Sequence, residues 1–240
     1  TLQRETFQRL VLISIIPAAL AVLVLALAAR EAPAARPPGE RPTQRLTLRG
    51  FDGRFRRFLL VVVLFTLGNS ADAFLVLRAQ ERGLSVAGVL AMLATFNLVY
   101  ALVSGPAGAL SDRVGRRRLI IGGWLLYRLL YLGFALAGAA WHIWALYALY
   151  GVYYGTVEGA ARAYVADLVP TERRGTAYGV FHAAVGIAAL PASAIAGVLW
   201  QGAGRWAGFG PSAPFLFGAA LALVAVTLFV AWVPGQEGPG

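Results

Sequence analysis

The chain alternates between long apolar runs and short polar stretches. Seven runs of 19 to 25 residues carry few or no charges. At a rise of about 1.5 Å per residue, a helix of that length crosses the roughly 30 Å hydrocarbon core of a bilayer. The pattern therefore predicts seven transmembrane helices, at residues 7–29, 58–77, 86–110, 119–140, 141–165, 176–200 and 215–233.

The spacing of these runs divides the chain into four segments. Residues 1–29 hold the first span, residues 30–57 form a linker, residues 58–233 form a six-helix bundle, and residues 234–240 form a C-terminal tail. The linker holds eight Arg, three acidic residues and four Pro, a composition typical of an irregular basic connection. The first residue is Thr, so we expect the chain to be a piece of a longer protein.

Arginine is distributed unevenly between alternating connections. The linker 30–57 and the loops 111–118 and 167–175 together hold fourteen Arg, whereas the opposite side holds five. Because basic loops are retained in the cytoplasm, we expect these three segments to be cytoplasmic. The protein is then expected in a membrane of the bacterial plasma (inner) type.

Composition supports an all-α integral membrane protein and excludes several classes of function. Hydrophobic residues make up 59% and charged residues 13% of the chain, where soluble domains are about a quarter charged. There is no Lys and no Cys, so a P-loop, a Schiff base and a cysteine nucleophile are all excluded. The net charge of +10 follows from the basic loops, and we expect no nucleic-acid partner, metal, cofactor or enzymatic activity.

The stretch between the third and fourth runs combines small and charged residues. It reads Gly108-Ala-Leu-Ser-Asp112-Arg113-Val-Gly115-Arg116-Arg117-Arg118. Asp112 ends one helix and three Arg begin the next, so both signs oppose the helix dipole. The arginines have a topological reason to be there, whereas Asp112 needs a partner, either Arg113, Arg116 or the N-terminus of another helix.

This stretch resembles the signature loop of the major facilitator superfamily of transporters. The matching positions are Gly108, Asp112, Arg113, Gly115, Arg116 and Arg117. The resemblance implies that the chain holds the last helix of a first six-helix half, the central loop, and a whole second half built as a 3+3 inverted repeat. It also implies a missing N-terminal half and alternating access, with the loop as a conformational latch. Asp167 or Glu172 would pair with a loop Arg.

Polar residues inside the apolar runs are candidates for substrate or proton binding. Ionisable side chains are costly in a bilayer and normally face a bundle interior or water. Asp72 and Glu158 are the two acids, and the resemblance places both toward the central cavity. Glu158 is either a proton or cation site or a structural ion pair with Arg162 or Arg128. The other candidates are Asn69, Tyr154 and His182, with Asn97 and Tyr100 as weaker ones.

Glycines at four-residue spacing predict close helix packing. Gly151, Gly155 and Gly159 form one stripe, and Gly175 and Gly179 form another. In lipid such stripes let helices approach closely.

We therefore expect a transporter of small solutes, proton-coupled and favouring efflux, with a lipid bilayer, a small-molecule substrate and protons as partners. A seven-helix receptor or a non-transporting membrane subunit is the alternative.

Overall fold

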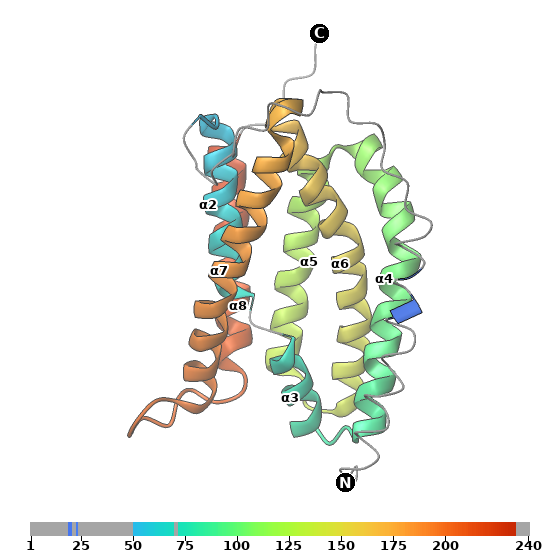
Figure 1. The fold of residues 1–240 in the computed structure, drawn as a ribbon. Coiled ribbons are helices and arrows are strands. Elements are labelled where there is room, and N and C mark those ends of the chain that lie inside the picture. The colour runs from blue at the N-terminus through green and yellow to red at the C-terminus, as the bar shows by residue number, and fades with distance from the viewer. Residues whose placement is uncertain (1–18, 21–22, 24–49, 70–71, 234–240) are drawn as a thin grey trace. The chain divides into compact units, whose positions relative to one another are not determined.

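The computed structural model describes residues 19, 20, 23, 50–69 and 72–233 (Figure 1). The first predicted span, most of the linker and the C-terminal tail lie outside these residues. From residue 50 onward the described part is helical and contains no β-strand, apart from an isolated bridge between Ala203 and Trp206. Its helices are α2 (Gly53–Gly68), α3 (Ala73–Glu81), α4 (Val86–Val114), α5 (Arg116–Leu136), α6 (Ala140–Asp167), α7 (Arg174–Gln201) and α8 (Ala213–Trp232), with a 3-10 turn at Thr171–Arg173.

Five helical segments of the described part are long and apolar enough to cross a membrane. They are Gly53–Glu81, which combines α2 and α3, Val86–Val114, Arg116–Leu136, Thr171–Gln201, which combines the 3-10 turn and α7, and Ala213–Trp232. The 28-residue α6 is not among them, because its tyrosines, glycines and charged residues make it less apolar. An all-helical membrane protein is thus what the described residues form.

The helices pack around a core of aromatic rings (Figure 1). Helix α2 lies against α7 and α8, α5 lies against α6 and α8, and α4 lies against α6. Phe65 stacks on Trp124 with ring centroids 4.7 Å apart, and Tyr127 stacks on Tyr131 at 4.0 Å. Such pairs contribute about 0.5–1.5 kcal/mol each beyond the area they bury. The first pair joins α2 to α5, and the second lies within α5.

The connection between α4 and α5 is shorter than the predicted loop. Helix α4 continues to Val114, so Asp112 and Arg113 lie in its last turn, and α5 begins at Arg116. Only Gly115 separates the two helices, with φ of 90°, a conformation that side chains rarely adopt. The chain therefore reverses between α4 and α5 at a single residue.

Two glycines of the predicted stripe on α6 lie directly against α4. A Cβ at Gly151 would come within 2.8 Å of the Phe96 carbonyl oxygen, and one at Gly155 within 3.1 Å of the Val103 side chain. At Gly159 and Gly175 no described atom outside the local helix lies within 4 Å of such a Cβ. Gly179 is half-buried on α7. The close approach of α4 and α6 is thus concentrated at the first two glycines.

Candidate transport site

The first span of the bundle is interrupted in its middle. Helix α2 ends at Gly68 and α3 begins at Ala73, where the sequence predicted one continuous run over residues 58–77. Asn69 ends α2, and its backbone N–H donates to the carbonyl oxygens of Phe65 and Thr66. Asp72 precedes α3 without capping it through its side chain. The interruption places both polar side chains at the same point of the bundle.

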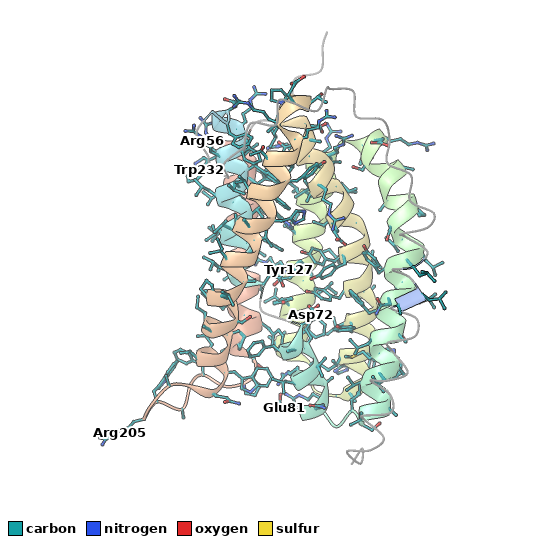
Figure 2. All side chains as sticks on the ribbon, viewed as in Figure 1. Arg56, Asp72, Glu81, Tyr127, Arg205 and Trp232 are labelled. Atoms are coloured by element: carbon teal, nitrogen blue, oxygen red, sulfur yellow. The ribbon has the colours of Figure 1, made fainter. Side chains whose placement is uncertain are left out.

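Three tyrosine hydroxyls meet this interruption. Figure 2 labels one of these residues, Tyr127, together with Asp72. The hydroxyls of Tyr127, Tyr131 and Tyr150 lie 3.5, 3.3 and 3.5 Å from Asn69 Oδ1. Tyr127 also donates at 3.1 Å to the carbonyl oxygen of Gly68, the last residue of α2. Tyr150 also lies 3.3 Å from Asp72 Oδ1. The tyrosines thus supply hydrogen bonds to the end of α2 from inside the bundle.

Asp72 is exposed where α3 begins, although it lies in the middle of the predicted span. Its one side-chain partner among the described residues is Tyr150. A carboxylate at membrane depth must reach water or another polar surface. The exposed side of Asp72 therefore needs a polar surrounding that the described residues do not provide.

A cleft of about 280 Å³ lies beside the interruption and collects five of the predicted candidates. It is lined by Asn69 from the end of α2 and by residues of α5, α6 and α7, with Phe65, Trp124 and Phe181 among its apolar walls. The candidates that line it are Asn69, Tyr154, Glu158, Arg162 and His182. An aromatic-walled cleft with a few polar groups is the usual form of a small-molecule site.

Glu158 links two helices at the edge of this cleft. Its Oε2 accepts a hydrogen bond from the Tyr100 hydroxyl of α4 at 2.7 Å, and its Oε1 pairs with Arg162 one turn further along α6. Glu158 followed by Arg162 at four-residue spacing is the favoured order for such a pair. Both alternatives from the sequence thus have a physical basis: a charge pair holds Glu158, and the cleft gives access to it.

Arg128 is placed apart from the cleft-lining candidates. It is half-buried on α5, and no hydrogen bond or ion pair joins it to another described residue. His182 lines the cleft and packs its ring on Phe181, with centroids 5.3 Å apart.

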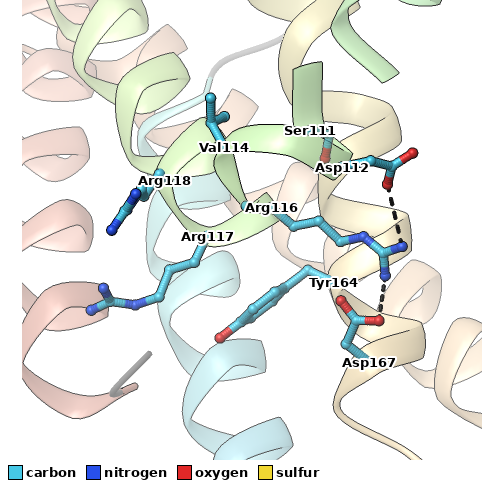
Figure 3. A pocket seen from close by; sticks show the side chains of 9 residues that line it. Ser111, Asp112, Val114, Arg116, Arg117, Arg118, Tyr164 and Asp167 are labelled. Atoms are coloured by element: carbon cyan, nitrogen blue, oxygen red, sulfur yellow. Dashed lines mark hydrogen bonds and ion pairs between the residues drawn. The ribbon is translucent and has the colours of Figure 1, made fainter. Parts of the chain in front are cut away.

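At the far end of the bundle, Arg116 connects α5 to both neighbouring helices (Figure 3). It lies 3.7 Å from Asp112 of α4 and forms a closer pair with Asp167 of α6. It also donates to the Ala163 carbonyl oxygen at 3.0 Å. Asp112, Arg116 and Asp167 therefore form one charged network that joins the ends of three helices.

The other residues of the predicted latch take different places. Arg117 donates to the Val233 and Val230 carbonyl oxygens at 2.9 and 3.1 Å, so it stabilises the C-terminal end of α8. Arg113 and Glu172 are exposed and have no ion-pair partner among the described residues. Nothing within the described part lies within 4 Å of a Cβ built at Gly108.

Arg78 is a buried polar anchor that the sequence did not identify. Its side chain is 1% exposed and donates to the carbonyl oxygens of Phe134 and Ala135, at 3.1 and 3.0 Å, to Ser212 Oγ at 3.2 Å and to Glu81 at 2.7 Å. It thus caps the C-terminal end of α5, where a positive charge interacts favourably with the helix dipole. The three-residue spacing of Arg78 and Glu81 was the only local signal.

The model of the Major Facilitator Superfamily matches residues 57–240, which include every described helix from α3 onward and the last twelve of the sixteen residues of α2. The chain belongs to the major facilitator superfamily. An MFS-type transporter of Methanocaldococcus jannaschii, named as uncharacterized, is 32% identical over 200 residues, which cover 81% of this chain and 48% of that protein. Multidrug resistance protein 2 of Bacillus subtilis is 32% identical over 140 residues, which cover 58% of this chain and 33% of that protein.

The matched region of this superfamily member holds the whole site. The chain spans about half the length, or less, of these curated relatives. The stretch that resembles the superfamily's signature loop forms the turn from α4 to α5, and its Asp112 and Arg116 belong to the charged network with Asp167. The predicted resemblance to the superfamily is confirmed over residues 57–240.

Proposed function

We propose that this chain supplies one half, and the last helix of the other half, of a transporter that moves small solutes by alternating access. Membership of the superfamily supports transport. In this proposal the six spans from α2–α3 to α8 form a 3+3 inverted repeat. The linker 30–57 and the loops 111–118 and 167–175 face the cytoplasm of a bacterial-type plasma membrane.

The single observation that carries the proposal is the cleft beside the interrupted span. It offers aromatic walls to a small apolar body and Glu158 and Arg162 to a polar end, inside a membrane-length bundle. We infer that the substrate is a small amphipathic compound. The name of the Bacillus subtilis relative, a multidrug resistance protein, is consistent with export of small compounds.

We propose proton coupling at Asp72 and Glu158. Glu158 is tied to Tyr100 and Arg162, so its protonation would weaken the pair with Arg162 and loosen the link from α6 to α4. Asp72 sits at the break between α2 and α3, where a change of charge acts on both halves of the span. Each acid thus connects proton uptake to a contact between moving elements.

The test is proton movement in liposomes that contain the complete protein under a pH gradient, with a panel of small amphipathic compounds. We expect substrate-dependent proton flux that is lost in Asp72→Asn and Glu158→Gln. Asp52→Asn is the matched control, since it also removes a carboxylate but Asn can still cap α2. Substrate transport without proton flux in the unmodified protein would contradict the coupling.

A further inference from the structure

The acceptor groups of the cleft beside the interrupted span are already engaged by the protein. Glu158 is the one acid in the lining, and both of its oxygens accept hydrogen bonds, Oε2 from Tyr100 at 2.7 Å and Oε1 from Arg162. Asn69 Oδ1 is approached by three tyrosine hydroxyls, each within 3.5 Å. A ligand that brings only donors would therefore have to compete with donors of the protein.

Two donor groups of the cleft, in contrast, are free to receive a ligand. The guanidinium of Arg162 carries several N–H donors, and within the described residues it donates only to Glu158. The Arg162 side chain is 53% exposed, so its remaining N–H groups are accessible. His182 packs its ring on Phe181 and forms no hydrogen bond with another described residue, although an imidazole always carries at least one N–H. The free polar groups of the cleft are thus donors.

Arg162 and His182 reach the cleft at the same level of the bundle, from α6 and α7. Phe58 of α2 contacts both Tyr164 and Phe181, with ring centroids 4.9 and 6.3 Å apart. These contacts place the turn of α6 that holds Arg162 level with the turn of α7 that holds His182. Both residues line the cleft, so their donors can converge on one ligand group.

The aromatic part of the cleft lies further toward the interruption. Phe65 follows Phe58 by about two turns of α2. Its ring stacks on Trp124 of α5, with centroids 4.7 Å apart, and both rings line the cleft. The cleft therefore combines a donor-rich end with an apolar, aromatic end, and a ligand that fits it has acceptors at one end and a flat ring at the other.

On the basis of the proposed transport function, we propose that the substrate of this cleft is an aromatic carboxylate. Its carboxylate accepts two hydrogen bonds from the Arg162 guanidinium, a pairing that charge and planar geometry both favour, and His182 is a further donor. Its ring lies against Phe65 and Trp124. Substrate and Glu158 then share one guanidinium, so a bound anion competes with the pair that holds Glu158.

The test compares three probes that share the same rings and differ in the polar end. They are 2-naphthoate, its neutral isostere 2-naphthamide, and 2-naphthylmethylammonium, and isothermal titration calorimetry measures their binding to the complete protein in detergent. We expect 2-naphthoate to bind about tenfold more tightly than either of the others, because hydrogen bonds between charged partners are about twice as strong as neutral ones. Arg174→Gln, an exposed arginine outside the cleft, is the matched control and should leave all three affinities unchanged.

Two variants separate a direct role of Arg162 from its role as the partner of Glu158. Glu158→Gln removes the competing carboxylate, so it should strengthen binding of 2-naphthoate and leave 2-naphthamide unaffected. Adding Arg162→Gln to Glu158→Gln leaves no unpaired acid in the cleft lining, and it should abolish the preference for 2-naphthoate over 2-naphthamide. A preference that survives the double substitution would overturn the proposal, as would equal affinities for the three probes or no binding of any.

Movement of the probes across proteoliposome membranes distinguishes this proposal from the transport function on which it rests. Transport of 2-naphthylmethylammonium but not of 2-naphthoate would leave the transport function standing and overturn the carboxylate. Binding of 2-naphthoate that depends on Arg162, without movement of any probe across the membrane, would support the carboxylate site and contradict transport.

Discussion

Arg78 is the largest fully buried side chain of the described residues, and it is charged. Its hydrogen bonds satisfy the carbonyl oxygens at the end of α5 and hold Ser212 in front of α8. We expect Arg78→Met to lower the free energy of unfolding in detergent by about 3 kcal/mol, because several buried acceptors lose their donor. Thermal or denaturant unfolding measures the change.

Two variants make this prediction specific to the hydrogen bonds of Arg78. Arg78→Lys should restore only part of the stability, since one ammonium cannot reach acceptors that a planar guanidinium bridges. Arg205→Met, in the exposed turn after α7, should leave unfolding unchanged. An Arg78→Met protein as stable as the Arg205→Met protein would show that the buried contacts contribute nothing.

The two aspartates that pair with Arg116 should differ in importance. Asp112 lies 3.7 Å away with its side chain 73% exposed, whereas Asp167 pairs more closely and its side chain is 36% exposed. Screening by water weakens the more exposed pair, so Asp167→Asn should reduce transport in proteoliposomes more than Asp112→Asn. If Asp112→Asn alone has the larger effect, Asp112 acts through a partner other than Arg116.

At the level of single residues, the sequence predicted contacts within one helix better than contacts between helices. The spacing of Glu158 and Arg162 indicated a pair on one face of α6, and the structure places them together. Nothing in the local sequence indicated that Tyr127 and Tyr150 approach Asn69, because their contacts are made only once α2, α5 and α6 pack. The roles of these residues in transport stay predictions.

At the level of elements, the contact of α4 with α6 depends on two glycines. A methyl group at Gly151 would lie 2.8 Å from the Phe96 carbonyl oxygen, closer than real contacts allow. We expect Gly151→Ala to destabilise the protein by about 1–3 kcal/mol through overpacking. Gly159→Ala on the same stripe is the matched control.

The control should be neutral or stabilising. A methyl group at Gly159 meets no described atom outside its own helix, and Ala is favoured over Gly in a helix by about 1 kcal/mol. Both variants are compared by their unfolding midpoints in detergent. Equal destabilisation by the two changes would contradict the claim that Gly151 is required for the close packing of α4 against α6.

The interruption between α2 and α3 was not predicted from the apolar run that contains it. The run over residues 58–77 keeps its apolar character past Asn69 and Asp72, so it predicts one continuous span. Gly68, Asn69 and Asp72 are the residue types that end and begin helices, and their clustering was the available signal. The Tyr127 hydroxyl of α5 donates to the carbonyl oxygen of Gly68, which stabilises this end of α2.

At the scale of the molecule, burial within the described bundle is uneven. Within an 18-residue apolar segment of each helix, 11% of the residues are buried in α4 and 17% in the segment that contains α7, compared with 50% in α5. Helices α4 and α7 therefore present the most surface to lipid or to other helices. In our account these faces border the substrate path between the two halves of the complete transporter.

The central claim, alternating access through this half, is tested most directly by thiol labelling from each side of the membrane. These 240 residues contain no Cys, so a cysteine introduced here is the only one in this part of the transporter. Ala161→Cys lies in the cleft, and Leu77→Cys lies on the exposed face of α3 beyond the interruption. Each cysteine is labelled with a membrane-impermeant thiol reagent. We expect acidification and substrate to raise the labelling rate at one site and to lower it at the other. Parallel changes at both sites, or none at either, would contradict alternating access.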